Sequence, residues 1–188
     1  MKVVSIVGMA GSGKSELATL FELKGFTRIR FGDITDREVM RRGLELNEYN
    51  ERTVRESLRQ EYGMAAYASF NLERIDAALK QSSVVVDGLY SWEEYILLKE
   101  YYGDAFLLVA VWSSPETRYK RLSGRGKRPL ARHEAAGRDR SEIENVNKGG
   151  PIAMADFTLI NEASMEEVKK AARIIIDRIC ETDHGKTD

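Results

Sequence analysis

The sequence has few of the features that mark secreted, membrane-spanning or metal-cluster proteins. Its 188 residues include one cysteine, Cys180, which excludes an internal disulfide framework and a multi-cysteine zinc site. No apolar run approaches the roughly 20 residues that a bilayer-spanning helix requires. The first residues, MKVVSIVGMA, are typical of a strand that enters a glycine turn rather than of a signal peptide. We therefore expect a cytoplasmic protein.

The sequence also lacks an excess of charge of either sign. Lys and Arg number 29 and Asp and Glu number 30, so the net charge is -1, and the hydrophobic fraction of 43% is ordinary for a globular protein. A chain of this length is typical of one domain with a sizeable core. We expect residues 1–188 to form a single domain, either monomeric or homodimeric, that does not bind membranes.

Short apolar strands alternate with amphipathic helices along the chain. Such alternation is typical of a parallel sheet with helices on both faces, which is an α/β fold of three layers and here has five strands. The expected strands are residues 3–7, 26–31, 82–88, 105–112 and 156–160. The expected helices are residues 14–25, 33–80 with breaks near 41–46 and 61–64, 91–102, 114–122, 138–147 and 164–179, and the last residues look frayed.

The stretch GMAGSGKS matches the phosphate-binding loop pattern G-x-x-x-x-G-K-[ST] at every fixed position. It follows an expected strand and begins an expected helix, which is the context that the pattern requires. Glycines let backbone N–H groups turn inward around an anion, a lysine reaches the β- and γ-phosphates, and a serine hydroxyl binds Mg²⁺. The predicted ATP-binding residues are Gly8, Met9, Ala10, Gly11, Ser12, Gly13, Lys14 and Ser15.

A phosphate-binding loop serves several classes of protein, and two of them fit poorly. A guanine-nucleotide switch needs Asn-Lys-x-Asp, whereas NKGG at Asn147 lacks the aspartate. LSGRG at Leu122 is similar to the signature of transporter ATPases, but such domains are longer and end their third-strand motif in adjacent acids. A kinase of small molecules fits better.

Six stretches in this order resemble the P-loop nucleoside-monophosphate-type kinases. The chain looks closest to a poorly characterised, largely archaeal-type family related to adenylate kinase and dephospho-CoA kinase, over nearly its whole length. The resemblance implies a five-stranded parallel sheet, an acceptor-binding helical insertion at 33–63 and a mobile lid at 121–140. The stretches are GMAGSGKS (8–15), FGD (31–33), EYG (61–63), VVVDG (84–88), RLSGR (121–125) and ADFTLIN (155–161).

Asp87 ends an apolar strand at the end of the sheet where phosphate is expected. A carboxylate there is costly unless it meets a cation, although it could also cap a helix. The resemblance implies that Asp87 lies beside Mg²⁺ and its waters, so that Ser15 and Asp87 form the metal site. Adenylate kinases place an arginine for the acceptor phosphate shortly after this aspartate, whereas this chain has Tyr90. This departure argues against ordinary AMP recognition.

Three residues are candidates for binding the acceptor. Asp33 resembles the family's acid near the acceptor, and relatives often carry arginine three residues later, where this chain has Asp36. Arg37 follows one residue later, a rotation of about 100° on a helix. Arg59 is a candidate phosphate contact, but the charges around it make a surface ion pair an equal possibility. We expect Asp33, Arg37 and Arg59 to bind substrate.

The stretch 121–140 carries seven basic residues and two acidic ones. In an adenylate-kinase lid, which RLSGR resembles, the first arginine lies against adenine and the second reaches phosphate. The resemblance therefore assigns Arg121 to the nucleotide and Arg125 and Arg138, near Arg140, to catalysis beside Lys14 and Asp87. Phosphoryl transfer needs positioned cations, and arginine supplies a fork of donors that stays charged. We expect hinge freedom at the glycines of this stretch, which are Gly124, Gly126 and Gly137.

A solvated basic surface, including a nucleic-acid surface, is the alternative interpretation of that stretch. Taken together, the residues predict a Mg²⁺-requiring, ATP-dependent phosphotransferase that acts on a small nucleotide-like acceptor. An alternative within the kinases is a dephospho-CoA kinase-like activity, in which Asp33 is the best candidate base for a ribose hydroxyl. An alternative from another class is an ATP-binding regulator with little turnover, which Tyr90 and Asp36 favour because they stand at expected arginine positions.

Overall fold

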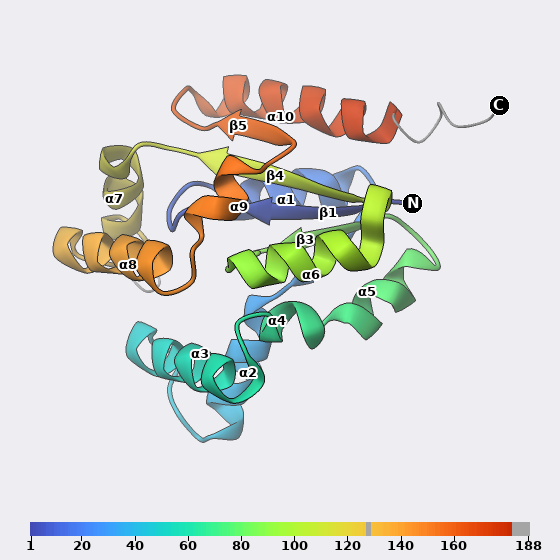
Figure 1. Ribbon diagram of the computed structural model, residues 1–188. Coiled ribbons are helices and arrows are strands. Elements are labelled where there is room, and N and C mark those ends of the chain that lie inside the picture. The colour runs from blue at the N-terminus through green and yellow to red at the C-terminus, as the bar shows by residue number, and fades with distance from the viewer. Residues whose placement is uncertain (127–128, 182–188) are drawn as a thin grey trace.

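A five-stranded sheet forms the centre of the computed structural model, which describes residues 1–126 and 129–181. Its strands are all parallel, in the order β2-β3-β1-β4-β5 (Figure 1). β1 and β3 are buried along their whole length, as expected of strands covered on both faces. The strands are β1 (Val3–Val7), β2 (Thr27–Arg30), β3 (Val84–Asp87), β4 (Phe106–Trp112) and β5 (Phe157–Ile160).

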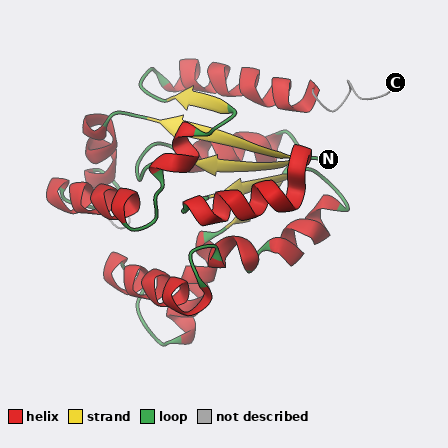
Figure 2. Cartoon of the chain, viewed as in Figure 1, coloured by secondary structure: helices red, strands yellow, loops and turns green. Residues whose placement is uncertain are grey.

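Helices cover both faces of this sheet (Figures 1 and 2). α1 and α10 pack on one face, and α5, α6 and α9 pack on the other, which confirms the predicted three-layer α/β fold. Among the described residues, no helix has the length and apolar character needed to cross a bilayer. The helices are α1 (Lys14–Leu23), α2 (Gly32–Arg41), α3 (Glu48–Tyr62), α4 (Ala66–Ser69), α5 (Leu72–Leu79), α6 (Trp92–Tyr102), α7 (Pro115–Ser123), α8 (Arg132–Glu144), α9 (Gly149–Ala153) and α10 (Met165–Glu181), with a 3₁₀ turn at Gly103–Ala105.

Four helices lie beyond the carboxyl ends of the strands rather than on the sheet. α7 and α8 form one pair, and α2 and α3 form a second pair (Figure 1). Leu122 of α7, Leu130 from the segment before α8, and Ala135 of α8 pack with Ala10 of the phosphate-binding loop in a small apolar cluster. The carboxyl edge of a parallel sheet is where ligands bind in open α/β folds, so both pairs flank the expected site.

The predicted bounds of one helix are wrong at both ends. The helix expected over 138–147 begins at Arg132 and ends at Glu144. Its first turn is stabilised because the Glu134 carboxylate accepts a hydrogen bond of 2.7 Å from the Ala131 backbone N–H. Gly137 therefore lies inside α8 and is not a hinge. Residues 127 and 128 of the expected lid, and the expected frayed end at 182–188, lie outside the described residues.

Candidate active site

The phosphate-binding loop, residues 8–15, connects β1 to α1. Two of its glycines cannot be replaced, since a Cβ on Gly8 would lie 2.4 Å from the Val111 carbonyl oxygen and one on Gly13 would lie 2.2 Å from the Asn161 amide nitrogen. Both glycines also have positive φ angles, of 152° and 99°. The loop is therefore held tightly against β4 and the end of β5, with the N-terminus of α1 directed at the space above it.

Lys14 is the first residue of α1 and folds back over the loop. Its ammonium group donates hydrogen bonds to the carbonyl oxygens of Gly8, at 2.8 Å, and Met9, at 3.0 Å. Burial, and then the nearby charge of Lys148, lower the pKa of Lys14 to about 7. An anion bound in the loop would favour the charged form of this side chain.

Ser15 and Asp87 line the same cleft as Lys14. The side chain of Asp87 is only 6% exposed and forms an ion pair of 2.5 Å with Arg28, whose guanidinium also pairs with Glu22 at 2.9 Å. A hydroxyl and a carboxylate fit Mg²⁺, which prefers oxygen ligands and is usually held by one or two side chains together with substrate phosphates. No group of three or more potential metal-ligating side chains occurs among the described residues.

A cleft of about 990 Å³ extends from the phosphate-binding loop to the helices beyond the sheet. It is lined by residues of the loop, of α2 and α3 on one side, and of α8 on the other. This size lies at the upper end of the range for small-molecule sites. Besides Lys14 and Lys148, the cations that line it are Arg30, Arg52, Arg55, Arg59, Arg125 and Arg138.

The structure brings some of the sequence-predicted residues together in this cleft and places others outside its lining. Ala10, Gly11, Lys14, Ser15, Arg59, Asp87, Arg125 and Arg138 are among the lining residues. Arg121 instead lies behind the loop, where it donates hydrogen bonds to the Ser113 hydroxyl at 3.0 Å and to the Asn161 carbonyl oxygen at 3.1 Å. Asn161 in turn donates to the Ser12 carbonyl oxygen at 2.8 Å.

Asp33 and Arg37 are outside the lining of the cleft. Arg37 is exposed and donates from its Nε to the Asp33 carbonyl oxygen at 3.2 Å. This orientation agrees with the rotation of about 100° that separates residue 37 from residue 36 on a helix. Asp33 and Asp36 both pair with Arg30, at 3.1 and 2.8 Å, and Asp36 and Arg30 line the cleft. The cation that lines the cleft next to α2 is therefore Arg30 of β2, in addition to the arginines of α3.

Two cations lie close to the Tyr90 ring, and sequence reasoning connected neither of them with it. The Arg59 guanidinium is 5.9 Å from the centre of the Tyr90 ring, and the Lys148 ammonium is 5.3 Å from it. Arg59 also lies over the Tyr67 ring at 5.2 Å, and its Nε is buried with no hydrogen-bond partner among the described residues. The position at which adenylate kinases carry arginine thus holds an aromatic ring flanked by positive charges.

α8 forms ion pairs with both α3 and α7. Arg138 pairs with Glu48 of α3 at 2.9 Å and with Glu142 at 3.1 Å. Asp139, on the next position, forms a buried bidentate pair of 2.6 and 2.8 Å with Arg118 of α7. The Arg118 guanidinium also donates to the Ala10 carbonyl oxygen at 3.2 Å, so this pair joins α8 to the phosphate-binding loop.

The Asp139→Asn variant should lower the free energy of unfolding by about 3 kcal/mol, because it leaves the buried Arg118 guanidinium without a compensating charge. Arg132→Ala is the matched control, since Arg132 pairs with Glu116 at 2.8 Å with both side chains about 70% exposed. Such an exposed pair contributes about 0–1 kcal/mol. Urea unfolding of the two variants measures the difference, and equal losses would show that Asp139 does not anchor α8.

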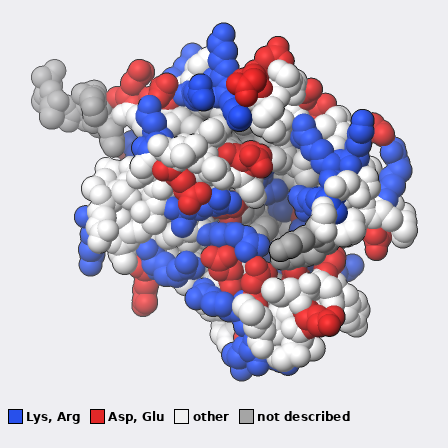
Figure 3. All heavy atoms as spheres, turned by 180° about the vertical axis from the view of Figure 1, so that it is seen from behind, with Lys and Arg blue, Asp and Glu red and all other residues white. Residues whose placement is uncertain are grey.

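Where the structure describes the stretch 121–140, at residues 121–126 and 129–140, acidic side chains pair with several of its arginines. Arg132 pairs with Glu116 at 2.8 Å, and Arg140 pairs with Glu144 at 3.9 Å. Basic and acidic side chains are interspersed over the face shown in Figure 3. Nucleic-acid surfaces are characterised by clustered, uncompensated positive charge, so this arrangement favours a small-molecule site over a nucleic-acid surface.

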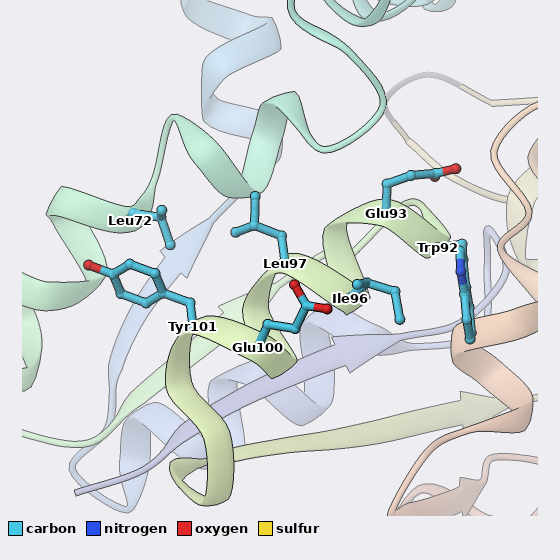
Figure 4. A pocket seen from close by; sticks show the side chains of 7 residues that line it. All are labelled: Leu72, Trp92, Glu93, Ile96, Leu97, Glu100 and Tyr101. Atoms are coloured by element: carbon cyan, nitrogen blue, oxygen red, sulfur yellow. The ribbon is translucent and has the colours of Figure 1, made fainter.

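A second hollow lies away from the phosphate-binding loop, between α5 and α6 (Figure 4). It measures about 630 Å³ and is lined mainly by apolar side chains from these helices, with the carboxylates of Glu93 and Glu100 at its border. Its lining residues include no lysine or arginine, whereas those of the first cleft include eight.

Sequence comparison identifies relatives over almost the full chain. The AAA domain family matches residues 4–147. A UPF0200 protein of Thermococcus kodakarensis is 38% identical over 181 residues, which cover 94% of this chain and 97% of that protein. These matches confirm the expected place among archaeal-type, kinase-like P-loop proteins.

Two solved kinases share the fold at low sequence identity. A gluconokinase from Sinorhizobium meliloti is 16% identical with a TM-score of 0.64, and the match covers 100% of this chain and 98% of that one. A dephospho-CoA kinase from Campylobacter jejuni is 17% identical with a TM-score of 0.58, and the match covers 97% and 100%. The chain therefore has the fold of P-loop kinases.

Proposed function

We propose an ATP-dependent phosphotransferase function for this chain, which belongs to the UPF0200 family. The acceptor is a small, nucleotide-like molecule, and Mg²⁺ is required. The observation that carries the proposal is that one cleft contains the phosphate-binding loop, Lys14, Ser15, Asp87 and cations from both α3 and α8. Phosphoryl transfer depends on positioned positive charge around the reacting group, and this cleft concentrates it.

The donor side of the cleft would bind MgATP. The loop N–H groups and Lys14 would bind the β- and γ-phosphates, and Arg121 with Asn161 borders the side of the loop where the adenine would lie. Ser15 and Asp87 would hold Mg²⁺, which neutralises charge on the phosphates when bound. The ion pair with Arg28 holds the Asp87 carboxylate at the end of β3.

The stretch 121–140 would serve as the lid, and residues 33–63 would form the acceptor-binding region. Arg125 and Arg138 are positioned to contact phosphate when the cleft closes, because both already line it. Closure would also exclude water, which would otherwise accept the phosphoryl group. On the acceptor side, Arg59 is the best-placed cation, while Asp33 and Arg37 would act only if α2 moves toward the cleft.

A dephospho-CoA kinase-like activity is the second candidate. It is supported by the full-length fold match to a dephospho-CoA kinase and by the ADFTLIN ending of the chain. In this case Asp33 would accept the proton of the attacking hydroxyl. The relation to adenylate kinase is less favoured, since Tyr90 stands at the acceptor-phosphate position.

The test is an acceptor screen. The wild-type protein is mixed with a non-hydrolysable ATP analogue and with nucleoside monophosphates or dephospho-CoA, and a rise in melting temperature identifies binders. Each binder is then tested for ADP formation from ATP. Acceptor-dependent ADP formation supports the proposal, whereas tight ATP binding with no dependence on any acceptor would favour a regulator that turns over little ATP.

The affinity for ATP should fall as the pH rises from 8 to 9. The pKa of Lys14, lowered by burial to about 7, leaves the side chain mostly neutral in the free protein at those pH values. Bound phosphates raise that pKa, so binding takes up a proton, and the affinity should fall by up to about tenfold per pH unit. Calorimetry in two buffers with different ionisation enthalpies measures the proton uptake. The Lys14→Met variant should bind ATP more weakly, with an affinity that does not change with pH in this range. If the affinity of the wild-type protein does not change with pH, the role of Lys14 is contradicted.

A further inference from the structure

The backbone on both sides of Lys148 is conformationally constrained. It lies in the connection between α8 and α9, directly after Asn147, whose φ angle is 51°, in the left-handed region. Its backbone N–H donates to the Glu142 carbonyl oxygen at 3.1 Å. Two residues later, a Cβ on Gly150 would lie 2.6 Å from the Trp92 ring, so only glycine allows this approach. The chain thus holds the Lys148 side chain in the cleft.

The ammonium group of Lys148 is buried with more positive than negative charge around it. The residue is 2% exposed, and its Nζ lies 2.8 Å from the Glu142 carboxylate. The same carboxylate pairs with Arg138 at 3.1 Å. Lys14 is close enough that the Lys148 charge lowers its pKa. Glu142 thus faces Lys148, Arg138 and Lys14, and Glu48, which also pairs with Arg138, is the second carboxylate, so three cations meet two carboxylates. Buried charge of one sign is costly unless an anion compensates it.

Lys148 lies near both Lys14 of the phosphate-binding loop and the ring of Tyr90. Lys14 lies at the loop where the phosphates of ATP would bind. The Lys148 ammonium group also lies 5.3 Å from the centre of the Tyr90 ring, and Arg59 of the expected acceptor-binding region lies 5.9 Å from the same ring centre. A group that passes from donor to acceptor would cross the space between Lys14 and Tyr90.

We propose that Lys148 is a catalytic residue that contacts the γ-phosphoryl group during its transfer. In that step the bond from Pγ to the β–γ bridging oxygen breaks and its electron pair leaves with ADP, while a bond forms from Pγ to an acceptor oxygen. An acceptor hydroxyl would release its proton to a base or to solvent. Lys148 would offset the negative charge on the equatorial oxygens of Pγ. This inference rests on the proposed phosphotransferase function.

The experiment compares two nucleotides that differ by the γ-phosphate. Lys148→Met removes the charge and keeps a similar volume. It should weaken the binding of AMPPNP by about ten- to a hundredfold, the effect of losing one charged hydrogen bond, and that of ADP by less than about twofold. Calorimetric titration of wild type and variant with each nucleotide, in the presence of Mg²⁺, gives the ratio. Equal losses for both nucleotides, or no loss for either, would overturn the assignment.

Two further variants keep the result interpretable. Lys170→Met, on the exposed surface of α10, is the matched control and should change neither affinity. If Lys148→Met is unstable because Glu142 loses a partner, Lys148→Met with Glu142→Gln removes both charges and should show the same preferential loss of AMPPNP binding. The ratio requires no turnover, so it tests Lys148 even if no acceptor is ever phosphorylated, and acceptor-dependent ADP formation by the wild type separately tests the proposed function.

Discussion

Replacement of Lys14 with alanine is expected to lower ATP turnover by about a thousandfold or more, because the phosphate-binding loop would lose the cation that reaches the β- and γ-phosphates. The variant should remain folded. Lys14 makes hydrogen bonds only to two loop carbonyl groups among the contacts observed, and burial already disfavours its charged form. Removing it therefore costs the fold little.

Steady-state ADP formation and a urea titration measure the two effects on the same preparation. Lys24→Ala is the matched control, since Lys24 lies just after α1 and pairs at the surface with Asp177 at 2.7 Å. It should leave turnover within about twofold of the wild type, as surface substitutions away from a site usually do. If Lys14→Ala turned over ATP at the wild-type rate, the loop could not be the site of phosphate binding.

The second large effect is expected from Asp87→Asn. The substitution keeps the shape of the side chain and removes the negative charge that would hold Mg²⁺ beside the phosphates. We expect turnover to fall by about a hundredfold or more and the Mg²⁺ concentration for half-maximal rate to rise, while nucleotide still binds. Arg28 would lose its charged partner on β3 but keep Glu22.

Turnover measured over a series of Mg²⁺ concentrations separates a metal role from a structural one. Asp177→Asn, on α10, removes a carboxylate of an exposed pair and should leave the Mg²⁺ dependence unchanged. If Asp87 has only a structural role, Asp87→Asn should lower the stability and leave the Mg²⁺ dependence unchanged. If the variant keeps both the wild-type rate and the wild-type Mg²⁺ dependence, Asp87 is not part of the active site.

The sheet and the phosphate-binding loop could be predicted because both are local properties of the sequence. Apolar strands such as Val84–Asp87 are recognisable from consecutive residues, and the loop depends on eight residues in a row. That Asp87, at the end of β3, and Ser15, at the start of α1, lie at the same edge of the sheet follows from the topology of parallel sheets. These predictions needed no knowledge of side-chain contacts.

The remaining residues of the cleft depend on contacts between distant parts of the chain. Arg138 pairs with Glu48, 90 residues away in the sequence. The Lys148 ammonium group lies 5.3 Å from the centre of the Tyr90 ring. The sequence did contain a signal for Arg30, because it lies near the end of the expected strand 26–31. In the structure it is in register with Asp87 at the end of β2. The sequence contained no signal for Lys148, whose NKGG context matched only an incomplete guanine-nucleotide motif. The start of α8 was missed because Glu134 and Ala135 stabilise a glycine-containing segment through a capping bond and packing.

The most direct test of the phosphotransferase proposal follows the γ-phosphoryl group itself. ATP labelled in the γ-position is incubated with the wild-type protein, Mg²⁺ and the acceptor that the screen identifies, and the products are separated. The proposal predicts that the label appears in the acceptor, in an amount equal to the ADP formed, and that Lys14→Ala abolishes this transfer. Label found only in inorganic phosphate, at the same rate with and without any acceptor, would contradict it.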